Sequence, residues 1–419
     1  MVGSSIGGIC ALGLGTRKWS LEECRMKFLK FSEQIFAPKS CFGRLLSRIT
    51  GGWFAILSNV AKLIFFDSIY DSAPIETILQ ESFGEASLMI QSDLEHPTKV
   101  AVVVNQASTS GPTVFANYNK SRHSKNGAYM WPAMDSLYRS LKIWEVARAT
   151  SAAPGFWDTI TLLGSAYQDG GLSHNNPSAI AISEANVLAS SRNADSLIVS
   201  VGCGRLFTAP LSKMSVFRRY IKVFEETLDA ERQHEVVAML TPERSGSLVR
   251  LNPRLDMEEV SLDEQSSISS LDDAVQSMLI SGSSAAKMFS DECKAAARRL
   301  IASLFYFELG HKMVRREATD QNQQTGVIKT RLTKDEFKAF KQGYPEVKFR
   351  VKDLMFDTSI STEVKLWSSS RDTQFKVELV HPSWTQQISG SPFTIAQLRE
   401  AQADYLPVVL RNGRKRKRG

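Results

Sequence analysis

Two short segments of this 419-residue chain carry side chains that could act together as a nucleophile and a base. The first, Gly3-Ser4-Ser5-Ile6-Gly7, fits the G-x-S-x-G pattern of a nucleophile elbow, a sharp turn from a strand into a helix. Glycines flank the serine in this pattern because the backbone approaches itself closely there. The helix that follows points its first amides, here Ile6 N–H, toward the oxyanion that forms on attack at a carbonyl. Ser5 is therefore the candidate nucleophile.

The second segment is Asp169-Gly170-Gly171, which supplies a carboxylate at a glycine turn. Such a carboxylate can lie close to a serine and act directly as its base and later as an acid. A plain turn is the alternative, because Asp-Gly is a strong turn signal. A histidine base is a further alternative, since Ser5, Asp169 and His174 or His381 follow the chain order of an α/β-hydrolase triad. None of the six histidines lies in a motif that marks it as a base: His96, His123, His174, His234, His311 and His381.

The surrounding pattern alternates helices with short β-branched runs, which is typical of an α/β fold. The most apolar window, residues 51–66, reads as a buried helix in preference to a lid or a membrane-contacting segment. Strands are expected at residues 100–105, 113–116 and 197–201, and helices at 6–14, from 20, at 75–82, 134–148, 216–240 and 271–309. Further strands are expected at residues 325–332, 347–356, 363–367 and 375–380.

Three segments in this order resemble the patatin-like lipid acyl hydrolases, particularly the fungal multidomain kind. They are GSSIGG at residues 3–8, ARATSAAPGFW at 147–157 and DGGLSHNNP at 169–177, and the likeness covers about residues 2–240. The resemblance implies a three-layer α/β/α fold with a mostly parallel sheet. It also implies a Ser–Asp dyad that needs no histidine, metal or cofactor, with Ser5 as nucleophile, Asp169 as base and acid, and Gly3, Ile6, Gly7, Gly170 and Gly171 as motif positions. The implied reaction is calcium-independent hydrolysis of acyl esters in phospholipids or related lipids, through an acyl-enzyme.

The chain departs from that family at its start. Patatin-like proteins carry a glycine-rich loop, D-G-G-G-x-R-G, before the elbow, and its amides form the oxyanion hole. Only Met1 and Val2 precede Gly3 here. We therefore expect an N-terminally truncated domain that lacks its first strand, this loop and the strand that leads into the elbow, with impaired activity. The alternative is a non-catalytic pseudoenzyme that binds lipid or protein.

The composition changes along the chain and predicts four parts. Residues 256–273 hold seven acidic side chains and no Lys or Arg, which is typical of an exposed connection. We expect a patatin-like catalytic domain at residues 1–240, an acidic linker with a helical extension at 241–310, a β-rich module at 311–400 and a basic tail at 401–419.

The net charge of +7 is concentrated in that tail, because six of the seven charges come from Arg411 and residues 414–418. The nearly neutral remainder predicts no nucleic-acid partner. The tail is compatible with a nuclear-import signal or a patch for anionic lipid, and equally with a disordered terminus. The five cysteines are scattered, which fits reduced thiols and a cytoplasmic protein without a zinc site. A lipid substrate adds peripheral membrane contact to these expectations, and nothing in the sequence points to one oligomeric state.

Overall fold

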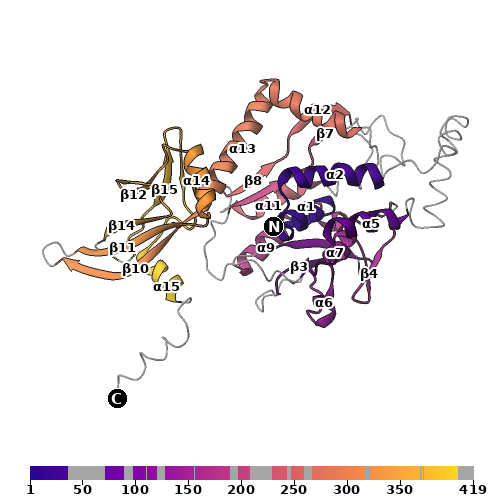
Figure 1. Cartoon of the computed structure of the whole chain (residues 1–419), viewed down its shortest axis with the longest axis horizontal. Helices are drawn as coiled ribbons and strands as arrows, with labels where there is room; N and C mark the ends of the chain where they lie inside the picture. The colour runs from indigo at the N-terminus through magenta and orange to yellow at the C-terminus, as the bar shows by residue number, and fades with distance from the viewer. Residues whose placement is uncertain are drawn as a thin grey trace, which may run out of the picture. The chain divides into compact units, whose positions relative to one another are not determined.

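The computed structural model describes residues 1–35, 71–88, 98–109, 111–119, 128–154, 156–188, 197–207, 229–242, 247–258, 267–316, 321–368, 370 and 372–403. The chain divides into two compact units, one of residues 1–190 and 200–286 and the other of residues 191–199 and 287–419. The units are described separately below, with the element labels of Figure 1.

A five-stranded sheet organises the first unit, and its central strand is β2 (Ala101–Gln106). One edge of β2 pairs along its whole length with β3 (Gly111–Ala116), antiparallel. The other edge is shared by two strands: β1 (Val2–Ser4) pairs in parallel with residues 101–103, and β5 (Ser165–Asp169) pairs antiparallel with residues 104–106. Strand β4 (Ile160–Leu162) extends the sheet beyond β5. Because β1 and β5 run toward each other along one edge, their last residues meet.

The α/β class is confirmed, but the expected mostly parallel sheet is a mixed one. Among the pairings described in this sheet, β1–β2 is parallel, whereas β2–β3, β2–β5 and β4–β5 are antiparallel. Two short connections explain why the pairs β2–β3 and β4–β5 are antiparallel. Only four residues separate the end of β2 from the start of β3, and Leu163 and Gly164, with φ of 51° and 75°, turn β4 directly into β5. Two residues with positive φ suit a hairpin, whereas a parallel neighbour requires a long crossover.

Helices cover both faces of this sheet (Figure 1). On one face Val102, Val104 and Phe115 pack against α1 (Ile6–Thr16), α2 (Leu21–Ile35), α5 (Ser72–Phe83) and α7 (Ile143–Thr150). On the other face Val103 and Val114 pack against Ile180 of α9 (Ser178–Leu188). Every position from Ala101 to Asn105 is buried, as expected for a strand covered on both sides. The layers are therefore helix, sheet, helix.

Other elements complete the first unit and refine several expectations. The helix expected at 134–148 is two helices, α6 (Ser136–Ser140) and α7, because Leu141 leaves helical geometry with ψ of 134°. The helix expected at 216–240 is confirmed in its second half by α11 (Ala230–Leu240). The remaining elements are α8 (Gly171–His174), the last two residues of β6 (Ile198–Val201), β7 (Arg205–Phe207), β8 (Leu248–Leu251), β9 (Arg254–Glu258), α12 (Ser267–Ile280) and the first residues of α13 (Ser284–Ser303).

The second unit confirms the expected β-rich C-terminal region. A three-stranded antiparallel sheet of β10 (Phe305–Arg316), β11 (Gln321–Thr330) and β14 (Ser361–Ser368) shares a core with a four-stranded one. The second sheet is formed by β12 (Lys348–Val351), β13 (Leu354–Asp357), β15 (Val377–His381) and β16 (Trp384–Gln387), with helices α14 (Lys334–Gly343) and α15 (Ile395–Ala403) beside them. The expected division of the chain into four parts, at residues 1–240, 241–310, 311–400 and 401–419, stays a prediction.

Several expectations fall on residues that the structure does not describe. Outside the described ranges lie the apolar window at 51–66, the part of the helix expected at 216–240 that precedes residue 229, part of the acidic stretch, and the basic tail beyond residue 403. Among the helices that are described, none has the length and apolar character needed to span a bilayer.

Candidate active site

Ser5 sits at the sharp turn between β1 and α1, as the elbow pattern predicts. The expectation that the strand leading into the elbow is missing was wrong, because Val2–Ser4 form β1 and pair with β2. The backbone of Ser5 has φ of 54° and ψ of −133°, a conformation that residues other than glycine rarely adopt. The turn brings the first helical turn back over the strand, so that a Cβ on Gly3 would lie 2.2 Å from the carbonyl oxygen of Gly7. A Cβ on Gly7 would meet no heavy atom within 4 Å. Backbone crowding therefore requires glycine at position 3 and not at position 7.

Asp169 ends β5 beside this turn, and its carboxylate contacts the serine. The Ser5 hydroxyl donates a hydrogen bond of 2.6 Å to Asp169 Oδ2, and the Gly171 N–H donates one of 2.7 Å to Oδ1. The sheet register explains the meeting, because Ser4 lies opposite Val103 and Asp169 lies opposite Val104 on the same edge of β2. The structure thus brings together two residues that are 164 positions apart.

Gly170 is the residue that lets the chain leave β5 at this point. A Cβ there would lie 2.2 Å from the carbonyl oxygen of Val103 and 2.8 Å from Ser4 Oγ. At Gly171 a Cβ would lie 3.0 Å from Asp169 Oδ1, so the second glycine is tight but less crowded. Because neither glycine carries a Cβ, the Asp169 carboxylate can lie close to the serine.

Burial determines the protonation behaviour of the carboxylate. Asp169 is only 5% exposed, and this desolvation raises its pKa to about 6, against the opposing effect of the hydrogen bonds from Ser5 and Gly171. A carboxyl group with that pKa is ionised at neutral pH and is a stronger base than an exposed aspartate. Its pKa is well matched to taking a proton from a hydroxyl and giving it back.

The first turn of α1 supplies the amides nearest to the nucleophile. The Ser5 carbonyl accepts from Gly8 N–H and Ile9 N–H, at 2.9 and 3.3 Å, and no side chain caps this end of the helix. The N–H groups of Ile6 and Gly7 precede these bonds and have no partner within the helix. They point out of the positive end of the helix dipole, where a developing oxyanion is stabilised.

The histidine alternatives find no support in the described part of the chain. His174 lies in α8, five residues after Asp169, and its Nδ1 is buried without a hydrogen-bond partner among the described residues. His381 belongs to the second unit, where its Nδ1 contacts Ser383 Oγ at 2.9 Å. Among the described residues no imidazole forms a hydrogen bond with Ser5 or Asp169. No group of three or more metal-ligating side chains is found within the described ranges either.

One contact of the elbow was not anticipated from the sequence. The Ser5 N–H donates a hydrogen bond of 2.9 Å to Thr150 Oγ1, at the end of α7. Thr150 belongs to the segment at residues 147–157, which carried the family likeness without an evident structural reason. Its hydroxyl has no signal in the sequence beyond membership of that segment.

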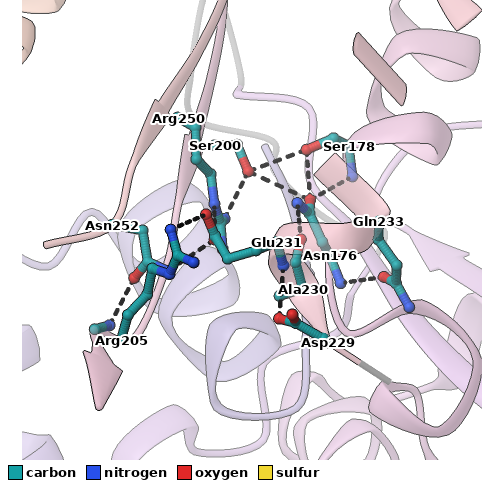
Figure 2. A network of polar contacts seen from close by, with 11 residues as sticks. Asn176, Ser178, Ser200, Arg205, Asp229, Ala230, Glu231, Gln233, Arg250 and Asn252 are labelled. Carbon is teal, nitrogen blue, oxygen red and sulfur yellow. Dashed lines mark hydrogen bonds and ion pairs between the residues drawn. The ribbon is translucent and has the colours of Figure 1, made fainter. Parts of the chain in front are cut away.

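A polar network holds the chain that follows Asp169 (Figure 2). Asn176, which precedes α9, is 3% exposed and accepts from the backbone N–H and the hydroxyl of Ser178, at 3.1 and 2.5 Å. The side-chain Nδ2 of Asn176 donates to the Ala230 carbonyl at 3.0 Å, and its backbone N–H donates to Gln233 Oε1 at 2.8 Å. The network thereby ties the start of α9 to α11.

A charged pair forms the other half of the network. Arg250 Nη1 donates to Ser200 Oγ at 2.9 Å, and Ser200 Oγ donates to Asn176 Oδ1 at 3.3 Å. Glu231 accepts from Arg250 Nε and from Asn252 Nδ2, both at 2.7 Å. Burial alone raises the pKa of Glu231, but the hydrogen bonds and positive charges of its partners lower it below its ordinary value. The pair is mostly buried, with side chains 10% and 15% exposed.

We expect Arg250→Met to lower the free energy of unfolding by about 2 kcal/mol, because the largely buried Glu231 carboxylate loses the charged donors of Arg250 and keeps only Arg205, at 3.9 Å, as a cationic partner among the described residues. Arg25→Met is the matched control: its ion pair with Asp272 is half exposed, at 3.3 Å, and its loss should change stability by about 0.5 kcal/mol or less. Urea unfolding of both variants measures the difference.

Because the folded-state pKa of Glu231 is lowered, the difference in the free energy of unfolding between Arg250→Met and the parent should persist at neutral pH. It should close as the pH falls through that lowered pKa. Equal effects of the two variants would contradict this account of the network.

The fold and the site together define an α/β protein in which a serine at a strand–helix elbow is paired with a buried aspartate. Comparison with known proteins agrees: residues 1–182 match the family model of the patatin-like phospholipases. These residues therefore match a patatin-like phospholipase domain, in agreement with the resemblance in the sequence.

Curated relatives extend the match beyond that domain. The chain is 30% identical over 279 residues to the calcium-independent phospholipase A2-gamma of Oryctolagus cuniculus, which covers 62% of this chain and 31% of the relative. It is 26% identical over 297 residues to phospholipase A I of Arabidopsis thaliana, over 62% of this chain and 22% of the relative. A cGAMP-activated phospholipase of Vibrio cholerae is 30% identical over 186 residues, with 44% of this chain and 45% of the relative covered. The chain thus spans between about a fifth and a half of the length of these relatives.

Proposed function

We propose that this chain is a serine hydrolase of acyl esters in lipids, of the phospholipase A type, with Ser5 and Asp169 as its catalytic dyad. The observation that carries the proposal is the 2.6 Å hydrogen bond from the Ser5 hydroxyl to a buried carboxylate at a strand–helix elbow. The named activities of the relatives, phospholipase A2 and phospholipase A, favour an ester of a phospholipid as substrate.

The reaction would proceed in two displacements. Asp169 accepts the Ser5 proton as Ser5 Oγ attacks the ester carbonyl, and the oxyanion that forms accepts hydrogen bonds from the Ile6 and Gly7 amides. Collapse of this intermediate breaks the ester C–O bond, and the proton on Asp169 passes to the departing alcohol oxygen. A water molecule then attacks acyl-Ser5 with Asp169 again as base, which releases the fatty acid and restores the serine.

In this proposal, the rate depends on the groups that donate hydrogen bonds to the oxyanion. No D-G-G-G-x-R-G segment occurs anywhere in the 419 residues, so the donors that we assign are those of the first turn of α1. Removing one oxyanion donor from a serine hydrolase typically lowers kcat by about 10²–10³-fold. Contact with the substrate would take place at the surface of a lipid bilayer.

A fluorophosphonate probe tests the assignment of the nucleophile. The probe should label the full chain at Ser5, identified by peptide mass spectrometry, and Ser5→Ala should abolish the labelling. Ser4→Ala is the matched control, because Ser4 is the neighbouring buried serine and its hydroxyl has no hydrogen-bond partner among the described residues. Absence of labelling in the parent chain would favour the alternative function, a non-catalytic module that binds lipid or protein.

A further inference from the structure

Thr150 connects the nucleophile elbow to the centre of the sheet. It is the last residue of α7 and is completely buried. Its hydroxyl oxygen accepts the Ser5 N–H at 2.9 Å, and its hydroxyl hydrogen is donated to the carbonyl of Val103 at 2.8 Å. A threonine hydroxyl can do both at once, since it has one donor and two acceptor sites.

The same short segment also holds the second member of the dyad. Two residues after Thr150, the carbonyl of Ala152 accepts the backbone N–H of Asp169 at 2.9 Å. Residues 150–152 therefore bind the backbone of Ser5 and the backbone of Asp169 through separate hydrogen bonds.

The sheet cannot provide this connection by itself. Strands β1 and β5 both pair with β2 and end at neighbouring residues of its edge, so no hydrogen bonds of the ladder run between them. The register on β2 brings these two ends close together, and contacts from outside the sheet then help to fix the distance between the serine and the carboxylate. The backbone of Ser5 is also strained, with φ of 54°, and such a conformation costs about 1–3 kcal/mol unless its surroundings hold it.

We propose that Thr150 is a positioning residue of the dyad: it binds the Ser5 amide and the Val103 carbonyl together and so sets Ser5 Oγ against Asp169. This inference rests on the proposed function of Ser5 and Asp169. It gives the segment at residues 147–157 a role in the site. Because the Ser5 N–H is occupied by Thr150, it also leaves the oxyanion to the amides of Ile6 and Gly7.

Thr150→Val tests the inference, because valine keeps the shape of threonine and removes both hydrogen bonds. We expect kcat and the rate of fluorophosphonate labelling to fall by about 10²-fold, as for a displacement of about 1 Å at a reacting group, with KM little changed. Thr150→Ser, which keeps the hydroxyl, should restore most of both rates. Thr113→Val is the matched control, since Thr113 is 2% exposed on β3 and its hydroxyl has no hydrogen-bond partner among the described residues. That control should label at the rate of the parent.

A second measurement does not depend on turnover. Hydrogen–deuterium exchange of a peptide that contains residues 2–8 should speed up at Ser5 in Thr150→Val and remain as in the parent in Thr113→Val. Unchanged exchange, or labelling of Thr150→Val at the parent rate while Ser5→Ala is inert, would overturn the role of Thr150 alone. Persistence of activity or labelling in Ser5→Ala would instead contradict the proposed function on which it rests.

Discussion

Replacing Asp169 by asparagine should lower kcat by about 10²–10⁴-fold, the usual contribution of a positioned general base. Asparagine is nearly isosteric, and its amide oxygen can still accept from the Ser5 hydroxyl or the Gly171 N–H, but it cannot take up a proton. Steady-state hydrolysis of a soluble ester by the parent and the variant measures the effect. Gln168→Glu on the same strand is a control for a local change of charge, and it should retain activity. Parent-like turnover by Asp169→Asn would exclude this carboxylate as the base.

The same substitution should have the opposite effect on stability. The folded-state pKa of Asp169, about 6, lies above the ordinary value of 3.8, so the folded chain binds this proton more tightly than the unfolded chain does. The contribution of this group to stability is therefore greatest at low pH and decreases as the pH rises from about 4 to about 6. Asp169→Asn carries no charge at this buried position, so its melting temperature at pH 8 should be no lower than that of the parent. Activity of the parent should rise with pH through about 6, as the base becomes ionised.

Gly3→Ala should destabilise the fold by about 3 kcal/mol, near the upper end of what overpacking usually costs. The added Cβ would lie 2.2 Å from the Gly7 oxygen and 2.5 Å from its carbonyl carbon. These are backbone atoms of the helix that carries the oxyanion donors, so they can move away only by opening the elbow. Urea unfolding gives the change in stability, and fluorophosphonate labelling shows whether Ser5 remains reactive.

Gly7→Ala is the matched variant at the other end of the motif. Gly7 is exposed in the first turn of α1, and a Cβ there meets open space. Alanine should leave the stability unchanged or raise it by up to about 1 kcal/mol, because alanine is the better helix former. Equal destabilisation by the two variants would contradict the geometry of the elbow described here.

The chemistry-bearing residues of the site could be predicted from the sequence better than the sheet that positions them. Ser5 and Asp169 lie in patterns whose glycines have a local reason, such as the crowding at Gly3 and Gly170. Strand β5 was not expected, because Ser-Ala-Tyr-Gln-Asp is short and mostly polar and lacks a β-branched run. Its pairing with β2 is set by a hairpin that turns at Leu163, a residue type that does not signal positive φ.

Contacts between segments far apart in the chain could not be predicted from the sequence for a related reason. The hydroxyl of Thr150 and the pair of Glu231 and Arg250 have ordinary neighbours along the chain, and each is given its role by a partner many residues away. Periodicity predicts which face of an element is buried, but not which polar group on a neighbouring element it will meet. Similarly, the helix expected at residues 271–309 is interrupted, because Gly282 adopts φ of 62° between α12 and α13, and its expected end at 305–309 is wrong, because these residues belong to strand β10.

The most direct test of the dyad is to look for the acyl-enzyme. The full chain is mixed with a short-chain phospholipid, quenched in acid within the first turnovers, and its intact mass is measured. We predict a species heavier by one acyl group, with the acyl group on the peptide that contains Ser5, and no such species in Ser5→Ala. A product that forms without any acylated protein, or an acyl group that remains in Ser5→Ala, would contradict catalysis by Ser5 and Asp169.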